Sequence, residues 1–183
     1  MIIEHQILEN VLLLKPNIFK DKRGYFFESF RESIFKENGY NIKFVQDNGV
    51  FSRHRDIIRG LHYQLEKPQG KLMQVITGAI ADVIVDIRVG SPDFGKSIMI
   101  KLDGKTHNLI YVPEGFAHGY LVLEDNTIVH YKCTNYYDPS SEYGIKWNDQ
   151  DINIPWDISS PIISDKDKTL PKLKDQKNLP QYQ

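Results

Sequence analysis

The amino-acid sequence predicts an all-β fold, a sandwich or barrel of jelly-roll type. Short runs that alternate polar and apolar residues, or that are rich in β-branched residues, follow one another along most of the 183 residues. Gly, Pro, Asp and Asn separate these runs at the close spacing typical of such folds. Helical patterns are confined to short segments. Periodicity alone does not distinguish a jelly roll from other sandwiches, and such folds serve lectins, structural domains and enzymes.

Ten segments have the composition and length of strands: Val11–Leu14, Gly24–Ser29, Lys43–Asp47, Ile57–Gln64, Leu72–Thr77, Ile80–Arg88, Ser97–Leu102, Asn108–Val112, His118–Val122 and Thr127–Thr134. We expect Thr77-Gly78 to form a tight turn between two of them. Gly90–Pro92 and Pro113–Gly115 are further turn signals.

Ser29–Asn38 fits two or three helical turns, with Gly39 placed to end them. Ser164–Asp167 can cap a short helix near the C-terminus. The polar, Lys-rich segment 171–183 is expected to be a loose surface extension. A hydrophobic content of 40% and an aromatic content of 11% fit one globular domain over residues 1–183.

Charge and cysteine content bear on partners and compartment. A net charge of −1 gives no global field that would recruit nucleic acid or an anionic membrane. No apolar run reaches the roughly 18 residues that span a bilayer, and residues 1–10 lack the apolar core of a signal peptide. The one cysteine, Cys133, cannot form an internal disulfide, and packing is favoured for it over a reactive thiol. The cytoplasm is therefore expected.

Nucleophile elbows, Walker loops, dinucleotide fingerprints and zinc spacings are absent from the sequence. A metal-binding cupin usually presents a His-x-His pair followed by Glu, whereas Tyr63 and Gln64 follow His62. A bound catalytic metal is therefore not expected.

The densest polar and aromatic cluster in strand-like sequence is Arg59–Gln64. Strand alternation places His62 and Gln64 on one face above Gly60, with Arg59 on the opposite face or at a strand start. Taken alone, a histidine in a strand is more often hydrogen-bonded packing than a functional group. Two further clusters are open to either a functional or a structural interpretation: Pro113–Gly119, around His118, and Tyr131–Tyr137.

Together these clusters resemble one family, the dTDP-4-dehydrorhamnose 3,5-epimerases. The resemblance runs from about Phe19 to about Leu170. Any one motif is weak, but ten occur in the family's order: Asp21–Phe30, Phe44–Asn48, Arg59–Gln64, Gln69–Leu72, Asp86–Arg88, Gly90–Lys96, Pro113–Gly119, Tyr131-Lys132, Asn135–Tyr137 and Ser164–Asp167.

The resemblance implies a cupin-type jelly-roll β-sandwich with short peripheral helices, a homodimer, and no metal or organic cofactor. It implies inversion of carbons 3 and 5 of dTDP-4-dehydro-6-deoxy-D-glucose, on the route to dTDP-rhamnose and cell-surface polysaccharide. Three alternatives stay open: a 3-epimerase, an epimerase of another nucleotide sugar, and a cupin that only binds carbohydrate.

The resemblance also implies catalytic roles that fit the chemistry. Carbons 3 and 5 flank the carbon-4 ketone, so enolate formation acidifies their protons. His62 would be the base, since imidazole has an ordinary pKa of about 6.5. Asp167 would hydrogen-bond to His62, and Tyr131 would protonate the opposite face of the ring. Lys71 would stabilise the developing oxyanion.

The remaining matches would bind the nucleotide sugar: Arg23, Glu28, Gln46, Asp47, Asn48, Arg59, His118, Tyr137, Glu142 and Lys166. Arg59 suits bidentate phosphate binding, and Tyr137 matches a ring that stacks on thymine. Ordinary surface charges and packing are the alternatives for these residues. The stretch 49–58 departs from the family pattern and is expected near the nucleotide, with its His54 exposed.

Overall fold

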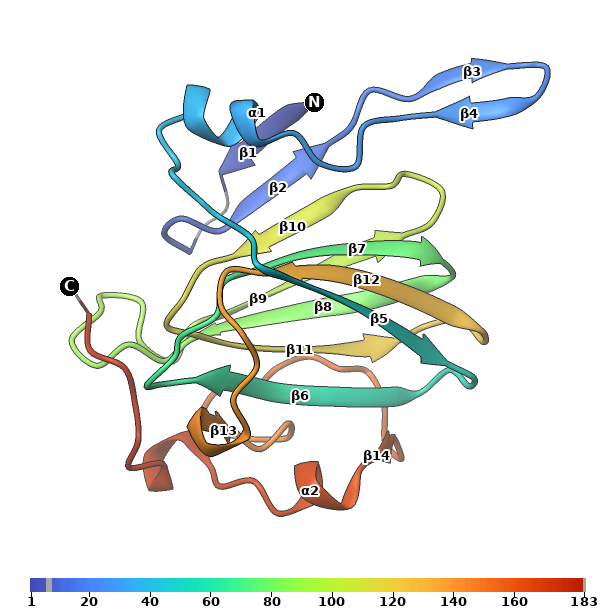
Figure 1. Cartoon of the computed structure of the whole chain (residues 1–183). Coiled ribbons are helices and arrows are strands. Elements are labelled where there is room, and N and C mark those ends of the chain that lie inside the picture. The colour runs from blue at the N-terminus through green and yellow to red at the C-terminus, as the bar shows by residue number, and fades with distance from the viewer. Residues whose placement is uncertain (6–7, 183) are drawn as a thin grey trace.

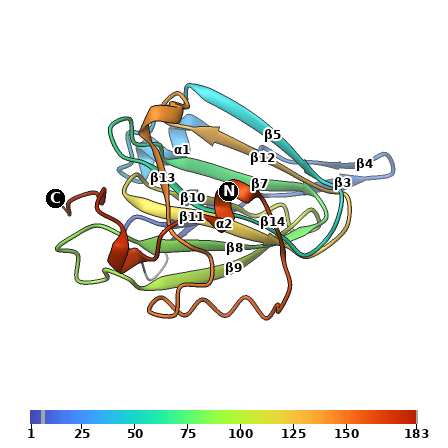
Figure 2. The same ribbon diagram turned by 90° about the horizontal axis from the view of Figure 1, so that it is seen from below.

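The computed structural model describes residues 1–5 and 8–182, and two β-sheets face each other within them (Figures 1 and 2). The first sheet has the strand order β1 (Ile2–His5), β2 (Leu12–Lys15), β10 (Leu109–Val112), β7 (Lys71–Thr77), β12 (Thr127–Cys133) and β5 (Gln46–Ser52). The second has the order β13 (Glu142–Gly144), β6 (Ile57–Gln64), β11 (Phe116–Val122), β8 (Ala79–Asp86) and β9 (Ser97–Asp103), and β14 (Ile162–Ile163) pairs with β6.

The smaller elements lie around these sheets and confirm the all-β fold with short peripheral helices. Strands β3 (Phe19–Asp21) and β4 (Gly24–Phe26) form a hairpin that projects away from the sheets (Figure 1). The helices are α1 (Glu32–Glu37), α2 (Asp165–Lys168) and the 3₁₀ turns Pro139–Ser141 and Leu173–Asp175. In the described part of the chain, no helix has the length and apolar character needed to cross a bilayer.

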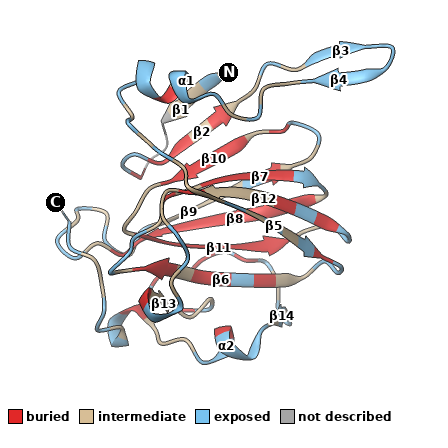
Figure 3. Ribbon diagram, viewed as in Figure 1, coloured by how far each residue is buried: buried red, intermediate tan, exposed pale blue. Residues whose placement is uncertain are grey.

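The main core fills the space between the two sheets. Buried side chains of both sheets meet there: Met73, Val75 and Val129 from the first, and Ile80, Ile84 and Val122 from the second. All eight residues of β8 are buried (Figure 3), because the chain after β13 covers the outer face of the second sheet with Ile152, Trp156 and Leu173. A strand covered on both faces has no need of polar alternation, which explains its apolar sequence.

Most of the longer predicted strands are confirmed, but Lys43–Asp47 is wrong. The strand there is β5, which begins at Gln46 and ends at Ser52. Most of its residues are polar or Gly, so it shows little of the apolar alternation that predicts strands. Thr77-Gly78 is a turn as predicted, with φ of +81° at Gly78, but the strands it joins lie in different sheets.

The predicted helices are confirmed in shorter form. Helix α1 ends at Glu37, where the Gly39 N–H donates to the Lys36 carbonyl. Helix α2 starts from Ser164, whose side chain accepts a hydrogen bond from the Asp167 N–H. This cap satisfies a backbone donor that has no partner inside the helix.

The prediction of a loose C-terminal extension is wrong for residues 171–182. Leu173 is buried in the core that covers the second sheet. Tyr63 donates a hydrogen bond of 2.7 Å to the Asn178 carbonyl, and Tyr182 donates from its backbone to Val89. The apolar residues spaced through this polar segment hold it on the surface, which average composition does not reveal.

Candidate active site

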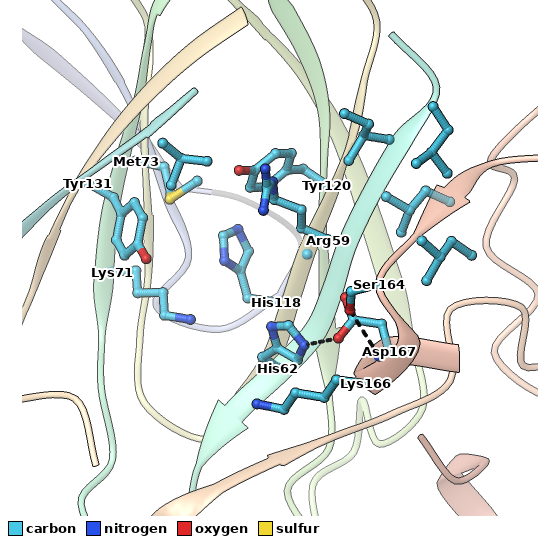
Figure 4. A pocket seen from close by; sticks show the side chains of 16 residues that line it. Arg59, His62, Lys71, Met73, His118, Tyr120, Tyr131, Ser164, Lys166 and Asp167 are labelled. Carbon is cyan, nitrogen blue, oxygen red and sulfur yellow. Dashed lines mark hydrogen bonds and ion pairs between the residues drawn. The ribbon is translucent and has the colours of Figure 1, made fainter. Parts of the chain in front are cut away.

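A cavity of about 490 Å³ lies between the two sheets, where β5, β7 and β12 face β6 and β11 (Figure 4). A second cavity of about 350 Å³ shares His62, Lys71 and Tyr131 with the first, so the two adjoin. Three of the four predicted catalytic residues therefore stand at the junction of the cavities, and the fourth, Asp167, lines the larger one.

A β-bulge brings Arg59 and His62 to the same side of β6. The register against β11 shifts between the pairs His118–His62 and Tyr120–Arg59, so two residues of β6 stand opposite Gly119. An extra residue of this kind re-aims the side chains beside it. Arg59 and His62 consequently both line the cavity. The prediction that Arg59 lies on the opposite face is wrong, and so is the alternative of a strand start, because β6 begins at Ile57.

The bulge depends on two glycines that face each other. A Cβ on Gly60 would lie 2.7 Å from the His118 carbonyl oxygen, and a Cβ on Gly119 would lie 2.6 Å from the Arg59 carbonyl oxygen. Both distances are too short for non-bonded atoms, so a side chain at either position would push the strands apart.

His62 is held by a buried carboxylate. Its Nε2 lies 2.7 Å from Asp167 Oδ1, and Asp167 Oδ2 accepts a hydrogen bond of 3.2 Å from the Gly60 N–H. Burial opposes ionisation of Asp167, but these hydrogen bonds outweigh burial and hold the pKa of Asp167 below its usual range. The ionised carboxylate can only accept, so Nε2 of His62 carries the proton and Nδ1 is the nitrogen that can act as a base.

A second imidazole in the cavity has the same arrangement, which the sequence did not reveal. His118 Nε2 lies 2.9 Å and 3.0 Å from the two carboxylate oxygens of Asp82, and Asp82 is fully buried. The signal was a carboxylate inside the apolar run Ala79–Asp86, because a charge is rarely buried without a partner. The partner lies 36 residues away, so only the fold identifies it.

Tyr131 and Lys71 come from the opposite sheet and face the two histidines across the cavity (Figure 4). Burial raises the pKa of the Tyr131 phenol, helped by nearby Cys133 and Glu142 and opposed by Arg59, so the phenol keeps its proton at neutral pH. Burial lowers the pKa of Lys71, against the nearby Cys133, Glu142 and Asp82.

Glu142 joins the two cavities through its contacts. Its carboxylate accepts a hydrogen bond of 2.6 Å from the Tyr137 hydroxyl, pairs with Lys166 and lies 4.0 Å from His62 Nδ1. Burial opposes ionisation of Glu142, but the bonds from Lys166 and Tyr137 keep its pKa below the usual range. The bond to Glu142 raises the pKa of Tyr137 to about 12.

Gln46 and Asn48 line the smaller cavity, but Asp47 between them does not. Strand β5 alternates, so Asp47 faces outwards and pairs with Lys132 at 2.8 Å. All three residues were predicted to bind the nucleotide sugar, but within this chain only Gln46 and Asn48 reach a cavity.

Arg23 and Glu28 lie outside both cavities of this chain. Arg23 is on the projecting hairpin and pairs with Asp21 at 2.6 Å, and Glu28 pairs with Arg31. His54 is exposed in the turn before β6, as the sequence predicted. The stretch 49–58 is mostly strand: residues 49–52 belong to β5, and residues 57 and 58 begin β6.

A histidine held by a carboxylate, opposite a protonated phenol in one cavity, fits the class of isomerases that work by proton transfer. The family model described as dTDP-4-dehydrorhamnose 3,5-epimerase matches residues 5–175. The dTDP-4-dehydrorhamnose 3,5-epimerase of Methanothermobacter thermautotrophicus is 46% identical over 171 residues, which are 92% of each chain. The chain belongs to the dTDP-4-dehydrorhamnose 3,5-epimerase family.

Solved structures support this assignment. The chain superposes with a TM-score of 0.94 on the Legionella pneumophila 3,5-epimerase in complex with dTDP-4-keto-L-rhamnose, at 39% identity over 99% of this chain and 98% of that one. It also superposes, with a TM-score of 0.91 and 33% identity, on a 3′-monoepimerase from Streptomyces bikiniensis in complex with dTDP-quinovose, covering 97% of this chain and 92% of that one.

Proposed function

We propose that this chain inverts carbons 3 and 5 of dTDP-4-dehydro-6-deoxy-D-glucose to give dTDP-4-dehydro-L-rhamnose, for rhamnose and polysaccharide synthesis. The observation that carries this proposal is the facing arrangement of His62, paired with Asp167, and Tyr131 across one cavity. Inversion at carbon requires removal of a proton from one face of the ring and delivery to the other, and this arrangement supplies a group on each side.

In the proposed reaction, Nδ1 of His62 accepts the proton of carbon 3 or carbon 5. The electron pair of the broken C–H bond moves into the ketone and gives an enolate, so the substrate is its own electron sink. Tyr131 then donates its phenolic proton to the opposite face of the same carbon. His62 returns its proton to solvent and Tyr131 regains one, which resets the pair for the second carbon.

Stabilisation of the enolate oxygen falls to Lys71. A fixed positive charge counts most when negative charge develops beside it in a site shielded from water, where one well-placed donor contributes about 3 kcal/mol. Burial lowers the pKa of Lys71, and negative charge that develops on the enolate oxygen beside it would oppose this shift and favour the ammonium. His118, held by Asp82, is a second sugar contact on the same wall.

Binding of the nucleotide falls to the polar rim. Arg59 and Lys166 line the larger cavity and suit the pyrophosphate. The smaller cavity, with Gln46, Asn48, Tyr137 and Glu142, has amide, phenol and carboxylate groups that suit the sugar and base of the nucleoside.

The protein acts as a homodimer in this proposal, and Arg23, Glu28 and Asp47 meet the nucleotide or the partner across the dimer interface. The support is the projecting hairpin, on which Phe19 and Phe26 are 62% and 67% exposed in the single chain. The reaction takes place in the cytoplasm, because a charged nucleotide sugar does not cross a bilayer unaided.

Solvent exchange tests the reaction. In heavy water, deuterium should enter both carbon 3 and carbon 5 of the substrate during turnover. Uptake at carbon 3 alone would instead favour a 3-epimerase, the second candidate, which the similarity to the Streptomyces bikiniensis enzyme supports. If neither carbon took up deuterium, the remaining candidate would be a protein that only binds carbohydrate.

His62→Ala tests the base within the same assay. This variant should lose nearly all exchange at both carbons, and circular dichroism should show an unchanged fold. His54→Ala is the matched control, since His54 is exposed and lies outside both cavities. Retained exchange in His62→Ala would remove His62 from the role of base.

A further inference from the structure

The hydroxyl of Tyr120 is a buried polar group without a protein partner. Tyr120 lies on β11, beside Asp82 of β8 and Arg59 of β6, and is only 5% exposed. Its oxygen has no hydrogen-bond partner among the described residues. Buried tyrosine hydroxyls ordinarily find a partner, and an unsatisfied one costs stability. Such a group is retained where something other than the protein satisfies it.

This hydroxyl lies in the cavity that holds the proposed catalytic residues. Tyr120 lines the larger cavity, and Figure 4 shows its oxygen directed towards the space beside Met73 and Arg59. Much of the surrounding wall is apolar, with contributions from Val50, Ile57 and Met73. A single hydroxyl on such a wall can determine which part of a ligand lies against it, because most of its surroundings offer no competing hydrogen bond.

Burial raises the pKa of Tyr120, and the nearby charge of Arg59 opposes this shift without reversing it. The phenol therefore keeps its proton near neutral pH and can serve as a hydrogen-bond donor.

Resting on the proposed function, we infer that the Tyr120 hydroxyl donates a hydrogen bond to the 2-hydroxyl of the sugar ring. The carbon-4 oxygen is assigned to Lys71 and the anomeric phosphate to Arg59. The oxygen on carbon 3 changes its position during inversion, and carbon 5 carries a methyl group. The 2-hydroxyl keeps its configuration through both inversions, so a donor fixed on a strand can hold it throughout.

This contact makes Tyr120 a specificity-determining residue. An enzyme with this donor discriminates against 2-deoxy sugars, because such a sugar leaves the buried hydroxyl unsatisfied in the complex. The discrimination is a property of binding and is present before any proton moves.

Binding of two unreactive ligands tests the inference. Both lack the ketone: dTDP-6-deoxyglucose and its 2-deoxy counterpart, measured by isothermal titration calorimetry. The wild-type protein should bind the 2-hydroxy ligand roughly 3- to 10-fold more tightly, as expected for one hydrogen bond. Tyr120→Phe should remove this difference by weakening only the 2-hydroxy ligand.

Tyr111→Phe is the matched control, because Tyr111 is equally buried but lies outside the cavity, and it should leave both affinities unchanged. Equal weakening of both ligands by Tyr120→Phe, or no weakening of either, would overturn the contact with the 2-hydroxyl. A wild-type protein that binds these ligands as expected but exchanges no deuterium would contradict the proposed epimerisation and leave this inference standing.

Discussion

At the scale of single residues, two imidazoles in the cavity each hold a buried carboxylate at Nε2. Asp167 does this for His62, and Asp82 for His118. Each carboxylate determines which nitrogen carries the proton, and a wrong tautomer is costly in catalysis. These two buried carboxylates would therefore control the proposed proton transfer.

Asp167→Asn should lower kcat by about 10²- to 10⁴-fold while the nucleotide still binds, because the amide can stabilise the wrong tautomer of His62. Turnover and dTDP affinity measure the two effects. Asp165→Asn is the matched control, since Asp165 lies in the same helical turn with a fully exposed side chain. Equal kcat losses in the two variants would contradict a specific role for Asp167.

The same pair makes folding stability depend on pH. The folded pKa of Asp167 lies below its unfolded value of 3.8, so its contribution is complete above that value and is lost as the pH falls through the folded pKa. The difference in free energy of unfolding between wild type and Asp167→Asn should therefore stay constant at pH values well above 3.8 and shrink as the pH falls below that value.

A second residue-scale prediction concerns the acid. Tyr131→Phe should slow product formation by about 10²- to 10⁴-fold. Exchange of the abstracted proton with heavy water should fall less, because His62 is still present to form the enolate. Tyr136→Phe, at a tyrosine that is 65% exposed, is the control. Equal loss of exchange and product in Tyr131→Phe would show that Tyr131 is not the acid.

At the scale of elements, the site depends on one irregularity, the bulge between β6 and β11. A regular strand would direct Arg59 and His62 to opposite faces, since they are three residues apart. The bulge resets the alternation and places both in the cavity. The proposed phosphate contact, Arg59, and the proposed base, His62, therefore share one strand.

Gly119→Ala should destabilise the fold by about 1–3 kcal/mol, because its Cβ would lie 2.6 Å from the Arg59 carbonyl oxygen. The forced displacement should also weaken dTDP binding through Arg59. Thermal unfolding and calorimetric titration measure both. Gly49→Ala is the control, since a Cβ there meets no atom within 4 Å. Wild-type stability in Gly119→Ala would mean that the bulge tolerates a side chain.

At the scale of the whole molecule, exposed aromatic residues gather on the β3–β4 hairpin. Phe19, Tyr25 and Phe26 are each more than half exposed, and the hairpin projects away from the sheets (Figure 1). Apolar surface of this kind is typical of interaction sites. A second subunit that covers the hairpin would bury it and bring Arg23 to a cavity.

Phe26→Ser should shift the protein from dimer to monomer, as measured by light scattering across a concentration series, because it removes apolar area from the proposed interface. A reduced dTDP affinity should accompany the shift. Phe94→Ser is the control, since Phe94 is 43% exposed but lies in the turn between β8 and β9. A monomeric wild-type protein, or an unchanged dimer in Phe26→Ser, would contradict this arrangement.

The sequence predicted the fold wherever strands were long and apolar, such as Ile80–Arg88, and it selected His62, Lys71, Tyr131 and Asp167 through their motifs. Strands β1 (IIEH) and β13 (EYG) were not predicted, because they are short and lack the apolar run that marks the equally short β2 and β10. The bulge could not be predicted, because it arises from the pairing of two strands. The pairing of Asp82 with His118 could not be predicted either, because the two residues are distant in the chain.

The proposed base and acid are carried by separate layers, His62 by the second sheet and Tyr131 by the first. Packed sheets stand about 10 Å apart, and the interdigitated residues between them determine that spacing. Core residues such as Val129, which do not line the cavity, thus determine the width of the gap available to a sugar. Substitutions among these core residues could therefore adapt the cavity to a larger or smaller sugar ring without any change to His62 or Tyr131.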